Sequence, residues 1–138
     1  MRIMAIDYGD AHTGIAISDP TGFLAGFTTV INAYRPEVVA EQVAALAKEH
    51  GVEELVLGHP INMDGTRGPR SEKAQAMKAL LEETTSLPVV LWDERRTTID
   101  AHQILFNSGK NAKKRKKVVD AVAASLILEG YLTYKKNL

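Results

Sequence analysis

The stretch that decides the fold is IMAIDYGDAHTGIAISD, residues Ile3–Asp19. A short apolar run ends at Asp7, a small polar turn follows, and Gly14 opens a second apolar run that ends at Asp19. Apolar runs this short, bounded by glycine and polar residues, are typical of buried strands rather than helices. We therefore expect a β-hairpin with Asp7 at the end of its first strand. In the alternative interpretation Asp7 only caps the turn, a position that aspartate favours.

Composition limits the class of protein. The 138 residues fit a single domain, residues 1–138, and a 45% share of hydrophobic residues is enough for one core. The formal net charge is zero, so a polyanion would have to bind a local basic patch. The absence of cysteine excludes disulfides, thiolate metal sites and a cysteine nucleophile. Because we find neither a signal-peptide pattern nor a run of about 20 apolar residues, we expect a cytoplasmic protein without membrane association.

Turn residues and apolar periodicity divide the remaining chain into alternating strands and helices. The tight turn at Pro20 favours an antiparallel third strand over residues 23–31. We then expect a helix from Arg35 to a C-cap at Gly51, a strand over 54–58 and a loop over 59–70. A helix over 71–83 and a strand over 88–92 follow. The chain is expected to end with a helix that Thr97 or Thr98 caps and a last helix over 118–134. Crossover helices cover both faces of such a sheet. The sequence predicts an α/β fold with a mixed five-stranded sheet, an antiparallel three-strand meander plus parallel strands, flanked by helices.

Acidic residues fall where the strands of this sheet are expected to end. Ligands of open α/β sheets bind outside the carboxyl ends of the strands. Asp7 follows the first strand, and Asp93 and Glu94 follow the last. Asp120 interrupts an apolar helix, where an aspartate without a partner is costly. Carboxylates without histidine or cysteine partners suit Mg²⁺ or Mn²⁺, and a carboxylate-bound metal pair can activate water for phosphodiester hydrolysis.

Each of these acids also has a purely structural explanation. Asp93 and Glu94 can form ordinary surface ion pairs with Arg95 or Arg96. Asp120 can be a first-turn acid that the helix dipole favours. The residues alone also leave open whether Asp93 or Glu94 is the metal ligand.

Basic residues are expected near the same end of the sheet. A run of five, together with Lys110, precedes the helix that carries Asp120, so phosphate contacts would lie beside the metals. A solvated run at a helix start is the alternative, although cations there oppose the helix dipole. The residues predicted to bind nucleic acid are Arg67, Arg70, Arg95, Lys113, Lys114, Arg115, Lys116 and Lys117.

Four motifs follow one another along nearly the whole chain. They are Asp7-Tyr8-Gly9 with Gly14, the segment GHPINMDGT at 58–66, Asp93-Glu94-Arg95 with Thr97 and Thr98, and Lys114-Arg115-Lys116 followed by Asp120. Together they resemble the YqgF family, a bacterial RuvC-like group of Holliday junction resolvases and pre-16S ribosomal RNA processing nucleases. The resemblance implies an RNase H-like fold. It also implies catalytic roles for Asp7, Glu94 and Asp120 and metal binding by Asp7, Asp93, Glu94 and Asp120.

One position departs from the related pattern. RuvC resolvases place an acid at the end of the fourth strand, where this chain has Gly58 and His59. We interpret His59 as a packed loop histidine. The alternative is an additional polar contact to the substrate.

These observations predict a nuclease, dependent on Mg²⁺ or Mn²⁺, that processes the 5′ end of precursor 16S ribosomal RNA. The nearest alternative is a resolvase-like endonuclease for Holliday junction DNA, which would act as a dimer. Another is a catalytically silent RNA-binding assembly factor. The D-x-G hairpin also resembles the phosphate loop of actin-like and sugar-kinase ATPases, but 138 residues leave no room for their second domain. The expected partners are structured RNA or branched DNA, and the expected state is a monomer or homodimer.

Overall fold

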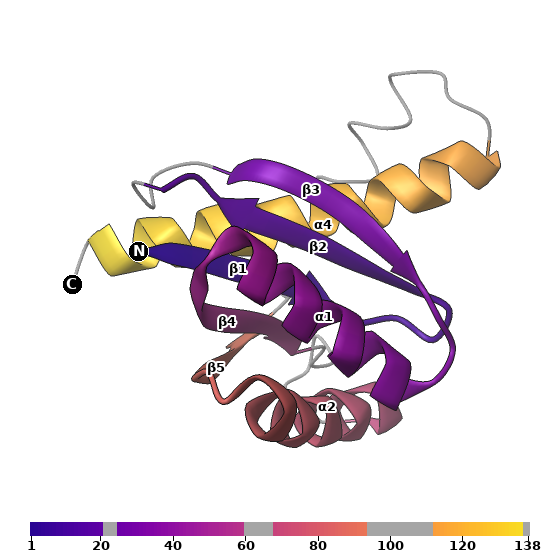
Figure 1. Ribbon diagram of the computed structural model, residues 1–138. Helices are drawn as coiled ribbons and strands as arrows, with labels where there is room; N and C mark the ends of the chain where they lie inside the picture. The colour runs from indigo at the N-terminus through magenta and orange to yellow at the C-terminus, as the bar shows by residue number, and fades with distance from the viewer. Residues whose placement is uncertain (21–24, 60–67, 94–111, 137–138) are drawn as a thin grey trace.

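The computed structural model describes residues 1–20, 25–59, 68–93 and 112–136, the last range through 120 by its backbone only. The elements are β1 (Arg2–Asp7), β2 (His12–Ser18), β3 (Ala25–Asn32), α1 (Pro36–His50), β4 (Val52–His59), α2 (Pro69–Thr85), β5 (Val89–Asp93) and α4 (Ala112–Lys136) (Figure 1). No helix within these ranges has both the length and the apolar character needed to cross a bilayer.

The five strands form one mixed sheet in the order β3-β2-β1-β4-β5. The pairs β1–β2 and β2–β3 are antiparallel, and the pairs β1–β4 and β4–β5 are parallel. The predicted three-strand meander and the parallel strands beside it are thus confirmed. The hairpin of Ile3–Asp19 supplies the central strand β1, on which both halves of the sheet depend.

The sheet separates two hydrophobic cores because side chains alternate along each strand. Met4 and Ile6 of β1 belong to the cluster beneath α1 and α2, whereas Ile3 and Ala5 belong to the cluster beneath α4. We call these two sides the α1–α2 face and the α4 face (Figure 1). Helices therefore cover both faces, as the sequence predicts.

Several boundaries agree with the sequence and others do not. α1 ends at a left-handed Gly51, with φ 68° and ψ 37°, as expected of a glycine C-cap. β4 continues to His59, so the prediction that His59 lies in a loop is wrong. α2 begins at Pro69 instead of Ser71, because proline suits the first helical turn. The helix expected after Thr97 or Thr98 lies outside the described residues.

The start of the last helix is the largest difference. The sequence predicts a helix from Val118, preceded by the basic run, but α4 begins at Ala112 and includes that run. Alanine, lysine and arginine are strong helix formers, so the apolar periodicity marks only the buried part of the helix. The basic residues Lys113–Lys117 therefore occupy the first turns of α4.

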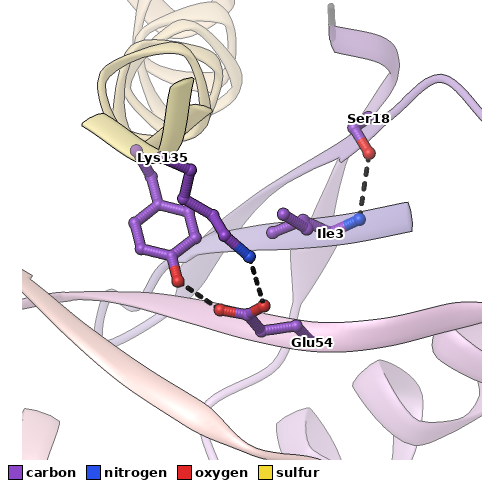
Figure 2. A network of polar contacts seen from close by, with 5 residues as sticks. Ile3, Ser18, Glu54 and Lys135 are labelled. Atoms are coloured by element: carbon purple, nitrogen blue, oxygen red, sulfur yellow. Dashed lines mark hydrogen bonds and ion pairs between the residues drawn. The ribbon is translucent and has the colours of Figure 1, made fainter. Parts of the chain in front are cut away.

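A buried polar cluster fixes α4 against β4. The carboxylate of Glu54, whose residue is 7% exposed, accepts a hydrogen bond from the Tyr131 hydroxyl, and Lys135 Nζ lies 3.1 Å from its other oxygen (Figure 2). Nearby, the Ile3 amide donates to Ser18 Oγ at 2.9 Å and ties β1 to β2. Removing one partner from a buried charged cluster leaves another uncompensated, so the cluster strongly favours one placement of α4.

We predict that Tyr131→Phe destabilises the protein and flattens its alkaline unfolding profile. Burial, followed by the Glu54 carboxylate, raises the pKa of Tyr131 above its ordinary value. Because unfolded tyrosine loses its proton near pH 10 while folded Tyr131 keeps it, this stabilisation is complete below about pH 10 and is lost above it. Urea unfolding at pH 8 should show a loss of about 1–3 kcal/mol in the variant.

The same titration between pH 8 and pH 11 should show a steeper loss of stability in the wild type than in Tyr131→Phe. Tyr34→Phe is the matched control, because Tyr34 is 81% exposed and no described residue hydrogen-bonds to it. Equal slopes for wild type and Tyr131→Phe would contradict the assigned cause.

Candidate active site

Polar residues from every strand meet at one edge of the sheet. β1 ends at Asp7, and β4 and β5 end at His59 and Asp93, which pair in register. β3 ends at Asn32, which pairs with His12 at the start of β2, and His12 Nδ1 lies 2.6 Å from Asn32 Oδ1. We call this the carboxyl edge, because the parallel strands end there. The α/β rule for ligand sites applies to this edge.

Side-chain alternation places Asp7 on the α4 face. Ile3 and Ala5 pack beneath α4, and Asp7 is the next residue in the same alternation. Asp7 is partly exposed at the end of its strand and pairs in register with Gly14 of β2. Its carboxylate is thus positioned by the central strand of the sheet and not by a loop.

Asp93 belongs to the opposite face. Trp92 of β5 packs beneath α4, whereas Leu91 packs against the cluster of the α1–α2 face. Asp93 is two residues after Leu91 in the same strand, so its side chain lies on the same face as that of Leu91, towards α1 and α2. With β4 between β1 and β5, the backbones of Asp7 and Asp93 are about 10 Å apart at the usual strand spacing.

The N-terminal half of α4, which carries Asp120, lies toward the carboxyl edge. α4 runs opposite to β1, with its C-terminal end beside the N-terminus of the chain (Figure 1). Tyr131 contacts Glu54 near the start of β4, and Asp120 lies eleven residues earlier, about 16 Å along the helix. From there α4 passes over β1, β2 and β3.

The structure describes only some of the residues predicted to bind nucleic acid or metal. Arg70 lies exposed in the first turn of α2, and Lys113–Lys117 are described by backbone alone. Arg67, Glu94 and Arg95 lie outside the described residues. Among the side chains that are described, no group of three or more acids or histidines could hold a metal ion. The predicted ligand set extends beyond those side chains, to Glu94 and Asp120.

His59 is packed inside the fold. It is 6% exposed, and its Nε2 lies 2.6 Å from Oγ of Ser71, a fully buried residue in the first turn of α2. Gln75 Nε2 also donates to Ser71 Oγ, at 3.3 Å. The contact joins the end of β4 to the start of α2, which agrees with the interpretation of His59 as a packed residue.

The sequence reasoning missed a cavity on the α1–α2 face. It measures about 410 Å³ and is lined by Tyr8, Asp10, Tyr34, Pro36, Lys73, Ala76, Met77 and Leu80. Burial, with a smaller effect from the Asp10 carboxylate, raises the pKa of Tyr8 above its ordinary value. The one available signal was Tyr34, an aromatic residue in the short connection between β3 and α1.

The family is decided by a comparison with protein-family models. The model described as "RuvX: Holliday junction resolvase" matches residues 1–134. The chain belongs to the RuvX family. A relative from Halothermothrix orenii, named "Putative pre-16S rRNA nuclease", is 45% identical over 138 residues, covering 100% of this chain and 99% of the relative. A relative of the same name from Bacillus subtilis is 43% identical over 134 residues, covering 96% and 97%.

Solved structures confirm the fold of this RuvX protein. RuvC from T. thermophilus, in complex with a Holliday junction substrate, aligns with a TM-score of 0.63 and 13% identity over 99% of this chain and 96% of that one. The Fowlpox virus resolvase, in complex with Holliday junction DNA, aligns with a TM-score of 0.61 and 12% identity over 98% and 99%. Together with the mixed sheet and its helices, these likenesses show the expected RNase H-like fold.

We predict that Gly9→Ala destabilises the turn that carries Asp7. A Cβ atom at Gly9 would overlap the carbonyl oxygen of His12, so the turn would have to open. The expected loss is about 1–3 kcal/mol in urea unfolding, typical of overpacking. Gly26→Ala is the matched control, because its Cβ would have its nearest neighbour at 3.5 Å, an ordinary contact. Equal stability of the two variants would show that the turn tolerates a side chain.

Proposed function

We propose that this RuvX protein is a divalent-metal-dependent nuclease that processes the 5′ end of precursor 16S ribosomal RNA. The observation that carries the proposal is the position of Asp7, at the end of the central strand and on the face that α4 covers. α4, which covers this face, carries Asp120. The names of the curated relatives give the proposed substrate.

Of Asp93, the last residue of β5, and Glu94, which follows it, we propose Glu94 as the metal ligand. Asp7 and α4 share one face of the sheet, and the alternation along β5 assigns Asp93 to the other face. An ion held by Asp7 on the α4 face would be out of reach of Asp93, with an entire strand between them. The proposed set is therefore Asp7, Glu94 and Asp120.

These donors fit Mg²⁺ or Mn²⁺ by their chemistry. All three are carboxylates, the oxygen ligands that hard cations prefer, and the chain has no cysteine to favour a softer metal. A bound ion of this kind would lower the pKa of a water molecule and neutralise charge on the leaving oxygen. The protein itself would fix the acids on β1 and α4, and basic residues would hold the phosphates.

The proposed phosphate contacts flank the carboxyl edge. Arg70 is exposed in the first turn of α2, and Lys113–Lys117 lie in the first turns of the helix that carries Asp120. A protein with zero net charge needs such a local cluster to attract RNA. A precursor of ribosomal RNA would place this activity in the cytoplasm.

The family description favours a second candidate, cleavage of Holliday junctions. A resolvase cuts two strands symmetrically, which requires two active sites related by a two-fold axis. Sedimentation equilibrium would then show a stable dimer, at least when the junction is bound. A complex with one copy per junction would exclude this candidate.

We predict that Asp7→Asn abolishes cleavage without unfolding the protein. Loss of an outer-shell partner of a metal costs about 10–100-fold in affinity or activity, so loss of a direct carboxylate ligand should cost at least as much. The assay compares a 5′-extended 16S RNA fragment with a synthetic four-way DNA junction, each with Mg²⁺, Mn²⁺ or EDTA. Glu41→Gln is the control, an exposed carboxylate-to-amide change on α1.

The outcomes separate the candidates. Metal-dependent cleavage of RNA alone, lost in Asp7→Asn, supports the processing nuclease, and cleavage of the junction alone supports the resolvase. Binding of RNA without cleavage under any metal supports the silent assembly factor. Full activity of Asp7→Asn would overturn the proposed site.

We further predict that Glu94→Gln reduces Mn²⁺ binding and cleavage strongly, whereas Asp93→Asn reduces them little. The physical reason is the assignment of Asp93 to the α1–α2 face, away from Asp7. Calorimetric titration with Mn²⁺ measures binding independently of any substrate. A larger loss in Asp93→Asn than in Glu94→Gln would show that the alternation of β5 does not decide the ligand.

A further inference from the structure

The cavity of about 410 Å³ lies beside the carboxyl edge. None of the proposed metal ligands whose side chains the structure describes lines it. It lies between α1 and α2, and residues of the turns after β1 and β3 also line it. Tyr8 comes directly after Asp7, and the two residues point to opposite faces of the sheet. We call this cavity the tyrosine pocket. Its volume is within the usual range for small-molecule and nucleotide sites.

The walls of the tyrosine pocket are aromatic and apolar. Tyr8 packs against the core, whereas Tyr34 is 81% exposed, the highest exposed fraction among the large hydrophobic side chains that the structure describes. Met77 and Leu80 of α2 form the inner wall. A flat aromatic ligand with polar edges matches this combination, since every nucleobase has a face that stacks on tyrosine.

The charges around the tyrosine pocket are paired. Lys73 Nζ lies 3.1 Å from Asp10, and Arg35 lies 3.9 Å from Glu37 at the start of α1. Such pairs leave the pocket close to neutral, which suits an uncharged base better than a phosphate or a charged amino acid. The tyrosine pocket is therefore complementary to the base of a nucleotide and not to its phosphate.

A second, smaller cavity lies beside the tyrosine pocket, at the carboxyl edge. It measures about 80 Å³, shares Tyr8, Asp10 and Lys73 with the pocket, and is further lined by Gly9, Gly58, Arg70 and Ala74. Gly9 and Gly58 bring no side chain into this small cavity. Arg70 has no ion-pair partner among the described residues and is available for a phosphate.

We propose that the tyrosine pocket holds an unpaired nucleotide of the substrate strand, with its base stacked on Tyr8 and Tyr34 and its phosphate beside Arg70. The strand crosses the sheet edge over Gly9 and Gly58, so that a neighbouring phosphodiester lies on the Asp7 side. This inference rests on the proposed nuclease function, which supplies the nucleic-acid ligand. It adds a requirement for a single-stranded nucleotide next to the cleaved bond.

The test measures binding in EDTA, where no cleavage occurs. The probe is a single-stranded RNA that carries the fluorescent adenine analogue 2-aminopurine, and stacking on tyrosine quenches its emission. The wild type should quench the probe, and Tyr34→Ala should bind it about 5- to 100-fold more weakly, the usual effect of losing one stacked base. Tyr34→Phe should restore both affinity and quenching, because it keeps the aromatic face.

Tyr134→Ala is the matched control, since Tyr134 is 47% exposed on the other face of the sheet, beside Trp92. It should bind and quench as the wild type does. Unchanged affinity and quenching in Tyr34→Ala would overturn the tyrosine pocket, even if cleavage remained dependent on Asp7. If the protein cuts neither RNA nor DNA but its quenching still depends on Tyr34, the proposed nucleotide pocket is supported and the proposed nuclease function is overturned.

Discussion

The alternation of side chains along β1 is the constraint on which the rest of the structure depends. β1 is the middle strand of the sheet and is covered on both faces, so its residues must alternate between two cores. A shift of one residue would exchange the two sets, so that each side chain would have to pack in the other core. The alternation continues where the strand ends, so Asp7 is on the α4 face and Tyr8 on the α1–α2 face. One turn thus supplies both the proposed metal ligand and a wall of the tyrosine pocket.

The second constraint acts from the far end of the sheet. Glu54, Tyr131 and Lys135 hold α4 at one height along β4. A slip of α4 by one helical turn would move Asp120, a proposed metal ligand, by about 5.4 Å, whereas metal–ligand distances vary by only about 0.2 Å. Burying this polar cluster costs desolvation, and its contacts from Tyr131 and Lys135 to Glu54 form only at this position of the helix. The cluster is therefore best explained as a device that fixes the register of α4.

Sequence reasoning predicted the order of elements well because turns and apolar runs are local signals. It placed Asp7 and Asp93 at strand ends for the same reason. It left the ligand choice after β5 open because β4 and β5 are apolar on both faces, so their sequence carries no alternation of hydrophobicity. Only the register with β1 and the positions of the helices assign faces to residues there.

The tyrosine pocket could not be predicted because its residues come from distant parts of the chain. Tyr8, Tyr34 and Lys73 meet only after α1 and α2 have packed against the sheet. The start of α4 was missed for a different reason. Its first turns carry no apolar periodicity, and the lysines and arginine there form helix by intrinsic preference instead of by burial.

The two faces of the carboxyl edge have a joint consequence for substrate recognition. With no net charge, the protein has little long-range attraction for nucleic acid, so a bound strand must be held by specific contacts near the edge. Basic groups on α2 and α4 can position phosphates, but they do not distinguish a paired strand from an unpaired one. A base can enter the tyrosine pocket only after it leaves its duplex. Stacking there would therefore select the single-stranded extension of a precursor and place it beside Asp7, a selectivity that the acids alone cannot provide.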